Sequence, residues 1–379
     1  MPDDVAERCI PAVNSLRVLW LSPGMRQLAR VRAEALRRRG VDVLLVTSDQ
    51  YFPKSDTRDY ELVLDPRFKK AATWPATFAA WRHIREFRPD LVISELVIDP
   101  RWMVLAGSAP RVQLVHDDRP HDPDEQLPRY KLAVSDRWGA RSAATVTCSH
   151  YVAAEVADRR DVAGTDIRVV PLCSDLDADE VPPFVGAEGR RDFVMLGRLN
   201  PYKNVDVVLQ AWEHHIAGNC WRGDDLVFIG DGPAMARALP KHTRWQSGKY
   251  RYSDVVATLA AAKASVAPHR RASQSGVQVL SMQLGVMPIV STAGALPEFQ
   301  PPDCPPVGVD DVAGLAAAFD KLSDPHTAAQ YGAAAASHYT QHFTIGQSAD
   351  GLLDVLTEVL AARWVAADGR PALSSPNPA

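Results

Sequence analysis

The chain has 379 residues, of which 46% are hydrophobic and 23% are charged, and its formal net charge is −4. A length of this order predicts about two or three domains, and the apolar content excludes a largely disordered chain. No apolar run approaches the ~20 residues of a membrane span, and the acidic first 15 residues lack an apolar segment, so we expect no signal peptide. Neither half of the chain is basic, so we expect no nucleic-acid partner.

Cysteines are few and scattered along the chain. The five cysteines stand at positions 9, 148, 173, 220 and 304, and no two of them form a Cys-x-x-Cys pair. An odd number at wide spacing is typical of free thiols rather than of a disulfide framework or a metal site. We therefore expect a reducing, cytoplasmic location.

The first half alternates short apolar runs with helical patterns. Residues 16–21 form an apolar run that ends at Ser22-Pro23-Gly24, residues 25–39 have helical spacing, and residues 41–47 form a second apolar run. A strand, a helix and a strand in this order need a parallel sheet. Further strands are expected at residues 91–94, 112–115, 145–148 and 167–170. This half is predicted to be a doubly wound α/β domain.

The second half repeats this pattern after a segment with the composition of a linker. Residues 174–190 are acidic and contain prolines and glycines. Strands are then expected at 193–196, 226–229, 264–267 and 288–291, and helices at 205–212, 277–284, 311–322 and 348–366. We predict a first domain at 1–180, a second at 181–345, a helix at 346–368 that packs back on the first domain, and a disordered tail at 369–379. Ligands should bind beyond the carboxyl ends of the strands, in a cleft between the domains.

Two cations follow the first strand of the second domain. Gly197 ends that strand, and Arg198 and Lys203 lie on the loop after it. Arginine can bind a phosphate with two parallel hydrogen bonds, and lysine adds a point charge. Solvated surface cations are the alternative. The position at the carboxyl end of a strand favours a phosphate site.

A second anion-binding feature lies at the start of the helix predicted at 277–284. Ser273, Ser275 and Gly276 precede this helix. Free N–H groups and the helix dipole make such a helix start suited to an anion. A serine here is more commonly an N-cap, and both roles can coexist.

In their order and spacing these segments resemble family 4 retaining glycosyltransferases. The segments that carry the resemblance in the second half are 197–204 (GRLNPYKN), 229–233 (IGDGP), Gly276, Gly285 and 288–291 (PIVS). Those in the first half are 22–24 (SPG), 115–117 (VHD) and 167–174 (IRVVPLCS). The resemblance covers roughly residues 16–362. It implies the GT-B fold, in which two Rossmann-like doubly wound domains face a central cleft, the first binding an acceptor and the second a nucleotide-sugar donor.

The chain departs from this family at two positions. The family has two glutamates, separated by seven residues, around the anion-binding helix, and Ser273 and Ser281 stand at those positions here. The first glutamate normally contacts the donor sugar and the second the ribose. A hydrogen bond to a charged group is worth ~1.5–3 kcal/mol, against ~0.5–1.5 kcal/mol for a neutral one. Gln274, Gln278 or Gln283 could replace these contacts with the donor, although helix packing is the favoured role of Gln278 and Gln283.

The resemblance implies a mechanism with little acid–base chemistry by the protein. The leaving diphosphate takes the proton of the acceptor while Arg198, Lys203 and the helix start at Gly276 stabilise its charge. His116 is expected to contact the donor sugar or the acceptor. The predicted catalytic residues are therefore Arg198, Lys203 and His116. The predicted donor-binding residues are Gly24, Gly197, Arg198, Lys203, Tyr250, Tyr252, Ser273, Ser275, Gly276, Val277 and Ser281.

No cofactor and no metal is expected, because the diphosphate leaves toward protein cations. The histidines and aspartates at 116–118 and 121–122 are too close in one loop to converge on a single ion. The expected activity is transfer of a sugar, with retention, to a polysaccharide, a lipid-linked glycan or a small molecule. The alternative is an inactive pseudo-glycosyltransferase that serves as a binding or scaffold subunit, which the two serines motivate.

Two basic segments leave room for peripheral contact with the inner face of the cell membrane. Arg30, Arg32 and Arg37 to Arg39 lie on the first predicted helix, where a solvated face is the favoured interpretation over a membrane surface. Residues 68–82 mix aromatics, among them Trp74, Phe78 and Trp81, with lysines and an arginine. This segment could dock a lipid-linked acceptor. We favour a helix whose aromatic side packs on the sheet.

Overall fold

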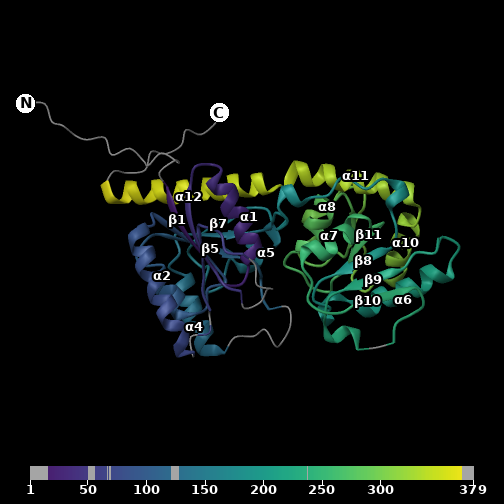
Figure 1. Ribbon diagram of the computed structural model, residues 1–379, viewed down its shortest axis with the longest axis horizontal. Coiled ribbons are helices and arrows are strands. Elements are labelled where there is room, and N and C mark those ends of the chain that lie inside the picture. The colour runs from purple at the N-terminus through teal and green to yellow at the C-terminus, as the bar shows by residue number, and fades with distance from the viewer. Residues whose placement is uncertain are drawn as a thin grey trace, which may run out of the picture.

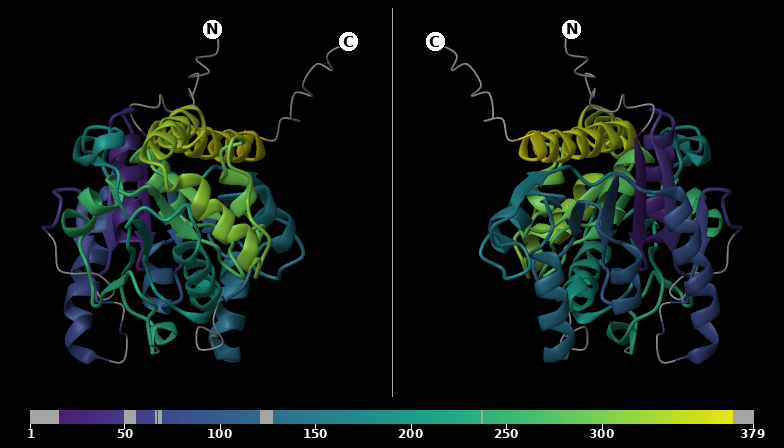
Figure 2. Two further views of the ribbon diagram at one scale, coloured as in Figure 1. Left: turned by 90° about the vertical axis from the view of Figure 1, so that its right-hand side faces the viewer. Right: turned by 90° about the vertical axis from the view of Figure 1, so that its left-hand side faces the viewer.

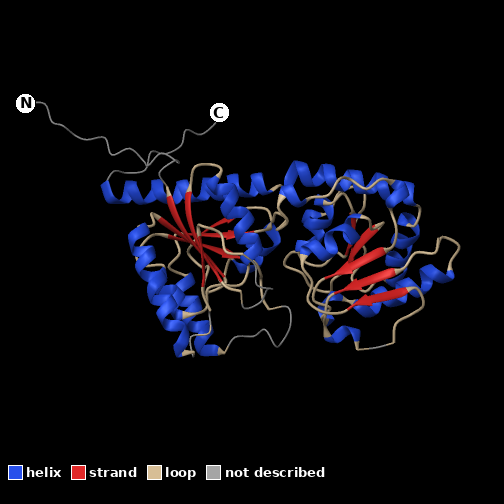
Figure 3. Cartoon of the chain, in the orientation of Figure 1, coloured by secondary structure: helices blue, strands red, loops and turns tan. Residues whose placement is uncertain are grey.

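The structure is a computed structural model, and it describes residues 16–49, 56–65, 67, 70–120, 128–236 and 238–368. Two α/β domains lie side by side, and the last two helices run along one side of both (Figure 1). Each domain has a central sheet with helices on its faces (Figure 3). The predicted tail at 369–379 lies outside the described residues.

The first domain is built on a seven-stranded parallel sheet with the order β3-β2-β1-β4-β5-β6-β7. Its strands are β1 (Arg17–Ser22), β2 (Asp42–Thr47), β3 (Glu61–Val63), β4 (Leu91–Glu95), β5 (Arg111–Val115), β6 (Ala144–Thr147) and β7 (Asp166–Val169). Its helices are α1 (Arg26–Arg37), α2 (Trp74–Phe87), α3 (Pro100–Leu105), α4 (Arg129–Gly139) and α5 (His150–Val156). The strand order reverses between β1 and β4, so their carboxyl ends open a crevice.

The second domain has a five-stranded parallel sheet with the order β10-β9-β8-β11-β12. Its strands are β8 (Phe193–Leu196), β9 (Leu226–Ile229), β10 (Thr243–Gln246), β11 (Ala264–Ala267) and β12 (Met287–Val290). Its helices are α6 (Val205–Ala217), α7 (Tyr252–Ala260), α8 (Gly276–Gln283), α9 (Leu296–Phe299), α10 (Val312–Leu322) and α11 (Pro325–His342). Its order reverses between β8 and β11. Both domains are therefore doubly wound, as predicted.

The last helix, α12 (Ile345–Asp368), returns to the first domain. Its residues Ala349, Leu352 and Leu356 belong to the same buried cluster as Val18 and Trp20 of β1. Arg39, just after α1, donates to the carbonyl of Gly346 at 2.9 Å and pairs with Asp350. The end-on views show the C-terminal helices, in yellow, running across the top of the molecule (Figure 2). The helix α12 thus packs its apolar face on the first domain, although it follows the second domain in the chain.

The expectation of a solvated face on the first helix is wrong for two of its arginines. Arg30 and Arg32 are buried in the structure. Arg30 pairs with the buried carboxylate of Glu61 at 2.5 Å, and the Arg32 guanidinium lies 3.9 Å from the Cys148 sulfur. The physical reason is that α1 is covered on more than one side. The periodicity of a helix shows that one face is buried, but it does not show whether another element packs on a second face.

The favoured orientation of the aromatic segment, with its aromatic side on the sheet, is wrong for two of its rings. Helix α2 buries only Ala80 and Ile84, whereas Trp74 is 54% exposed and Phe78 is 61% exposed. Ala80, Ile84 and the partly buried rings of Trp81 and Phe87 pack against the core of the first domain, whereas Trp74 and Phe78 face outward. Phe68 and Lys69 of this segment lie outside the described residues.

Among the described helices, none combines the length and the apolar character that crossing a bilayer requires.

Candidate active site

The predicted site residues gather at the carboxyl ends of both sheets, where the strand order reverses. In the first domain, Gly24 follows β1 and His116 follows β5. In the second domain, Gly197 and Arg198 follow β8, and His269 follows β11. Parallel strands present their carboxyl ends at one edge, so these loops converge there.

Three glycines hold the loop after β8 against the loop after β9. Gly197 and Gly230 have φ of 124° and 121°, in the region that favours glycine. A Cβ added at Gly230 would overlap the carbonyl oxygen of Gly197, and one added at Gly232 would overlap the carbonyl of Leu199. The amide of Leu199 also donates to the carbonyl of Asp231 at 2.8 Å. The backbone beside Arg198 is thus fixed by close loop packing.

Lys203 lies beneath this loop and is only 8% exposed. It ends a short 3-10 helix (Pro201–Lys203), and its Nζ lies 3.0 Å from Nε2 of His269. Burial, with a smaller contribution from the charge of Arg198, lowers the pKa of Lys203 to about 7. The ammonium group lacks a carboxylate partner among the described residues. A bound anion would supply the missing charge.

Arg198 has an exposed side chain at the mouth of the same loop. The next residues lead to Asn204, which adopts φ of 65° and is buried. Neither polar atom of the Asn204 amide has a hydrogen-bond partner within the described part of the chain. Buried amides are normally bonded, so this loop has unused hydrogen-bonding capacity.

The start of α8 lies beside this loop, and Ser275 acts as its N-cap. Its side chain accepts a hydrogen bond from the amide of Gln278 at 3.4 Å. Gly276, the first helical residue, is exposed, and a Cβ added there would meet open space. The amides of Gly276 and Val277 are among the first N–H groups of the helix, which have no carbonyl partner in a preceding turn. The N-cap interpretation and the anion-site interpretation of this segment are compatible here.

Two of the predicted donor-binding residues already have hydrogen-bond partners within the protein. The Ser281 hydroxyl donates to the Val277 carbonyl at 2.6 Å, one turn back in α8. The Tyr252 hydroxyl donates to Asp175 at 2.5 Å. Tyr250 lies near the Gly230 turn, with a ring carbon 3.5 Å from where a Gly230 Cβ would stand. Contacts of these residues with ribose or base stay predictions.

His116 lies across the cleft in a buried charged cluster. Its Nε2 lies 2.6 Å from Oε1 of Glu95, whose other oxygen accepts from Ser22 at 2.6 Å and from the Trp20 indole at 3.3 Å. Burial opposes the charged imidazole, but hydrogen bonds with Cys148 and Glu95 outweigh it and raise the pKa of His116 well above its ordinary value. The pKa of Glu95 is lowered, because the bond to His116 and the field of that ring outweigh its own burial. The carboxylate of Glu95 therefore favours the charged form of the His116 imidazole.

Two residues before α8 reach across the cleft to this cluster. Ser273 donates to Oδ1 of Asp118 at 2.6 Å, and the Asp118 amide lies 3.3 Å from the Ser273 oxygen. Nε2 of Gln274 lies 2.8 Å from Nδ1 of His116. The amide oxygen of Gln274 has no partner among the described residues. A flip of the Gln274 side-chain amide would place this oxygen against Nδ1 of His116, where it could accept a hydrogen bond from the charged imidazole. The predicted sugar-contacting position, Ser273, thus faces the first domain directly.

A second bridge joins the domains beside this cleft. The Glu298 carboxylate, on α9, accepts from the backbone amides of His150 and Tyr151 at 2.8 and 2.6 Å. These are the first amides of α5, where a carboxylate is favoured by the helix dipole. Cys148, Glu298 and Phe343 help to line a cavity of 320 Å³ between the domains.

Within the described ranges, no group of three or more His, Cys, Asp or Glu side chains is arranged to hold a metal ion. His121 and Asp122, weighed as metal ligands in the sequence, lie outside those ranges. Metal independence stays a prediction.

The sequence did not single out Glu95, Asp118 or His269 as members of this site. Glu95 could have been found, because it is a carboxylate at the carboxyl end of a central strand. His269 follows β11 in the same way. Asp118 bonds to a residue 155 positions away, and no local pattern carries that information.

Both halves of the chain match models of glycosyltransferase families. Residues 24–178 match the model described as Glycosyltransferase Family 4, and residues 190–324 match the model described as Glycosyl transferases group 1. The two matches fall on the two sheets of the fold. The chain is therefore a glycosyltransferase of the GT-B fold. No curated protein matches it.

Solved structures of similar architecture cover nearly the whole chain. A sucrose-phosphate synthase from Thermosynechococcus elongatus is 16% identical with a TM-score of 0.70, and the alignment covers 92% of this chain and all of that one. HepE from Anabaena, in complex with UDP and glucose, is 13% identical with a TM-score of 0.64, covering 90% of this chain and all of that one. A UDP-forming α,α-trehalose-phosphate synthase from Burkholderia xenovorans is 12% identical with a TM-score of 0.60, covering 91% and 99%. At these identities the likeness establishes the fold.

Proposed function

We propose that this protein transfers a sugar from a nucleotide diphosphate sugar to a hydroxyl acceptor, with retention at the anomeric carbon and without a metal ion. The single observation that carries the proposal is the burial of the Lys203 ammonium group without a carboxylate partner among the described residues. A buried ammonium group without a carboxylate, beside Arg198 and the open start of α8, is suited to a diphosphate. The UDP and glucose bound by HepE support a nucleotide-sugar donor in this fold.

The described residues suit a reaction in which the leaving group does the acid–base work. Arg198, Lys203 and the first amides of α8 would stabilise the diphosphate as the sugar–oxygen bond breaks. The departing diphosphate oxygen would accept the acceptor proton on the same face of the sugar. His116, whose charged form Glu95 favours, would hydrogen-bond to the sugar or the acceptor through Nδ1, in place of Gln274, rather than remove a proton.

The acceptor would bind on the first domain, near the loops that follow β1, β4 and β5. Gly24 lies against Leu96 there, with 3.1 Å between its Cβ position and a Leu96 methyl carbon. A polysaccharide, a lipid-linked glycan and a small molecule are the acceptor classes that we propose to test.

The test is release of nucleotide diphosphate from a panel of sugar donors with mixed acceptors, in wild type and Arg198→Ala. We expect release with one donor, and a loss of at least about 100-fold in the variant, because a charge aimed at the transition state is worth about that much. EDTA should leave the wild-type rate unchanged.

The matched control is Arg191→Ala, an exposed arginine of the same domain whose Nε donates to the Gly189 carbonyl at 3.4 Å. Its activity should equal that of wild type. Equal activity of Arg198→Ala and wild type would refute the site, and an EDTA loss restored by a divalent ion would refute the metal-free mechanism.

The second candidate is an inactive glycosyltransferase that acts as a binding or scaffold subunit. It is favoured by the bonds from Ser273 to Asp118 and from Gln274 to His116, which occupy groups that would otherwise contact the sugar. Tight nucleotide binding without turnover of any donor would support it. A donor that turns over would exclude it.

A further inference from the structure

The cysteine that follows β6, Cys148, lies among charged side chains. Its sulfur lies 3.9 Å from Nη2 of Arg32 on α1, and it shares a hydrogen bond with the imidazole of His116. Cys148 is a free thiol and is 4% exposed. Buried structural cysteines usually lie in apolar surroundings, where they are inert. The surroundings of Cys148 are instead those in which a thiol ionises.

The charges of this cluster balance when the Cys148 sulfur is negative. Arg32 is 1% exposed, and among the described residues it forms no ion pair with a carboxylate. Its Nε has no hydrogen-bond partner there. The carboxylate of Glu95 bonds to His116 at 2.6 Å. Arg32 and a charged His116 are thus two cations beside one carboxylate, and a thiolate supplies the second negative charge that buried cations require.

The pKa of this thiol differs from those of the other buried cysteines. Burial alone would raise the pKa of Cys148, but the hydrogen bond with His116 and the charge of Arg32 outweigh burial and lower that pKa. Cys173 also lies beside Arg32, yet burial dominates there and raises its pKa. Burial likewise raises the pKa of Cys304. Cys148 is therefore distinguished from its neighbours by the charges around it.

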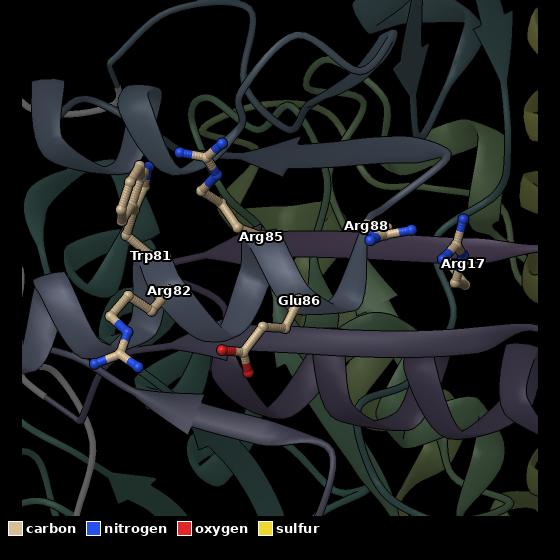
Figure 4. A pocket seen from close by; sticks show the side chains of 6 residues that line it. All are labelled: Arg17, Trp81, Arg82, Arg85, Glu86 and Arg88. Carbon is tan, nitrogen blue, oxygen red and sulfur yellow. The ribbon is translucent and has the colours of Figure 1, made fainter.

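A cavity gives small molecules access to this sulfur. Cys148 helps to line the 320 Å³ cavity between the domains, together with the exposed side chains of His150, Glu298 and His342. Because part of the lining is exposed, the cavity opens to solvent. A water molecule takes up ~30 Å³ in the liquid, so a molecule as small as a peroxide fits. By contrast, the open cavity of 560 Å³ beside α2 is lined by arginines, a glutamate and a tryptophan, without a thiol (Figure 4).

We propose that Cys148 is a site of oxidation by hydrogen peroxide, which reaches the sulfur through the cavity between the domains. The thiolate sulfur attacks one peroxide oxygen, so that an S–O bond forms and the O–O bond breaks. Sulfur loses two electrons, and the other oxygen leaves as hydroxide, which takes a proton from solvent to become water. The product is Cys148 sulfenic acid. The inference goes beyond the proposed function and does not depend on it.

Counting of thiols by mass spectrometry tests the proposal on the full chain. The protein is exposed to hydrogen peroxide at pH 6, the peroxide is destroyed with catalase, and the remaining thiols are alkylated in urea before digestion. We expect the Cys148 thiol to be lost at least about tenfold faster than the exposed Cys220 thiol, because an ordinary cysteine with a pKa of about 8.5 is almost wholly protonated at pH 6.

The product identifies the reaction. Dimedone added with the urea should label Cys148, since it reacts with a sulfenic acid and not with a thiol. Attack of Cys173 on that sulfenic acid would form a disulfide and release water. A disulfide between Cys148 and Cys173 therefore supports the proposal as the dimedone adduct does.

Substitutions at the two positive neighbours show whether the cluster causes the reactivity. Arg32→Gln and His116→Gln should each slow the oxidation of Cys148 about tenfold at pH 6, because each removes a charge that favours the thiolate. The matched control is His342→Gln, which removes an exposed imidazole from the same cavity and should leave the rate unchanged.

Melting temperatures show which of these variants are folded, since loss of a buried charge can destabilise a protein strongly. Wild type unfolded in urea tests the cluster without a substitution. There the difference between Cys148 and Cys220 should disappear.

Survival of the Cys148 thiol after Cys220 has been oxidised would overturn the proposal. So would equal rates at these two cysteines in the folded protein, or undiminished oxidation of Cys148 in folded Arg32→Gln and His116→Gln. None of these results bears on the proposed transferase activity, because the experiment uses neither a donor nor an acceptor.

Discussion

At the scale of the residue, Lys203 is the most informative side chain of the site. An isolated buried ammonium group is costly, and a lowered pKa is the usual result. A protein keeps such a group where a ligand supplies the opposite charge. The neighbours of the Lys203 ammonium group, Arg198 and His269, are positive or neutral, so neither supplies a negative charge.

This arrangement predicts a pH dependence of donor binding. Since the pKa of Lys203 is about 7 without ligand, the amine is mostly neutral above that pH and must take up a proton when a diphosphate binds. Affinity for the nucleotide sugar should therefore fall as pH rises from about 7 to about 9, by up to tenfold per pH unit. Calorimetric titration at several pH values measures this.

The control for that prediction is Lys203→Arg, because arginine stays charged throughout this range. Its affinity should be nearly independent of pH. A flat profile in wild type, or an equal slope in the variant, would contradict the role of Lys203.

The sequence allowed Arg198 and Lys203 to be placed on the loop after β8, because they follow a recognisable strand. It could not pair Ser273 with Asp118, or Gln274 with His116, since those contacts exist only when two domains face each other. The burial of Glu95 beneath His116 depends on strand order, which a single strand does not encode.

At the scale of the element, the strands of both sheets were predicted well because buried parallel strands are short apolar runs. β3 has only three residues, and β10 is largely exposed, so neither has that signature. α11 is rich in alanine, and its buried face consists of Ala328, Gly332, Ala335 and Tyr339, without a large aliphatic side chain. α2 was recognised as a candidate helix, but its pattern could not say which face meets the sheet.

The contact between the loops after β8 and β9 predicts a stability effect. Gly230→Ala should lower the free energy of unfolding by about 1–3 kcal/mol, since its Cβ would overlap the Gly197 carbonyl and its φ of 121° is strained for alanine. Urea unfolding measures the change.

Gly186→Ala is the matched control. It lies in the linker with φ of −74° and nothing within 4 Å of its Cβ position. It should leave the midpoint unchanged. Equal stability of both variants would show that the two loops do not need close contact.

At the scale of the whole molecule, the two domains are joined on several sides of the cleft. Glu298 bonds the start of α5, Ser273 and Gln274 bond the loop around His116, and α12 packs on the first domain. One buried apolar cluster also contains residues of both domains, among them Leu28 and Phe343. The candidate site is therefore formed by residues of both domains, and neither domain alone contains all of them.

The central claim is that the cleft holds a nucleotide diphosphate through Arg198 and Lys203. Its most direct test is the melting temperature of wild type and Arg198→Ala with millimolar UDP, GDP, dTDP, CDP and ADP. A ligand at ~100 times its dissociation constant stabilises a protein by ~2.7 kcal/mol, which shifts the melting temperature measurably. We predict a shift with one nucleotide in wild type that Arg198→Ala loses. No shift with any nucleotide, or an equal shift in the variant, would contradict the account.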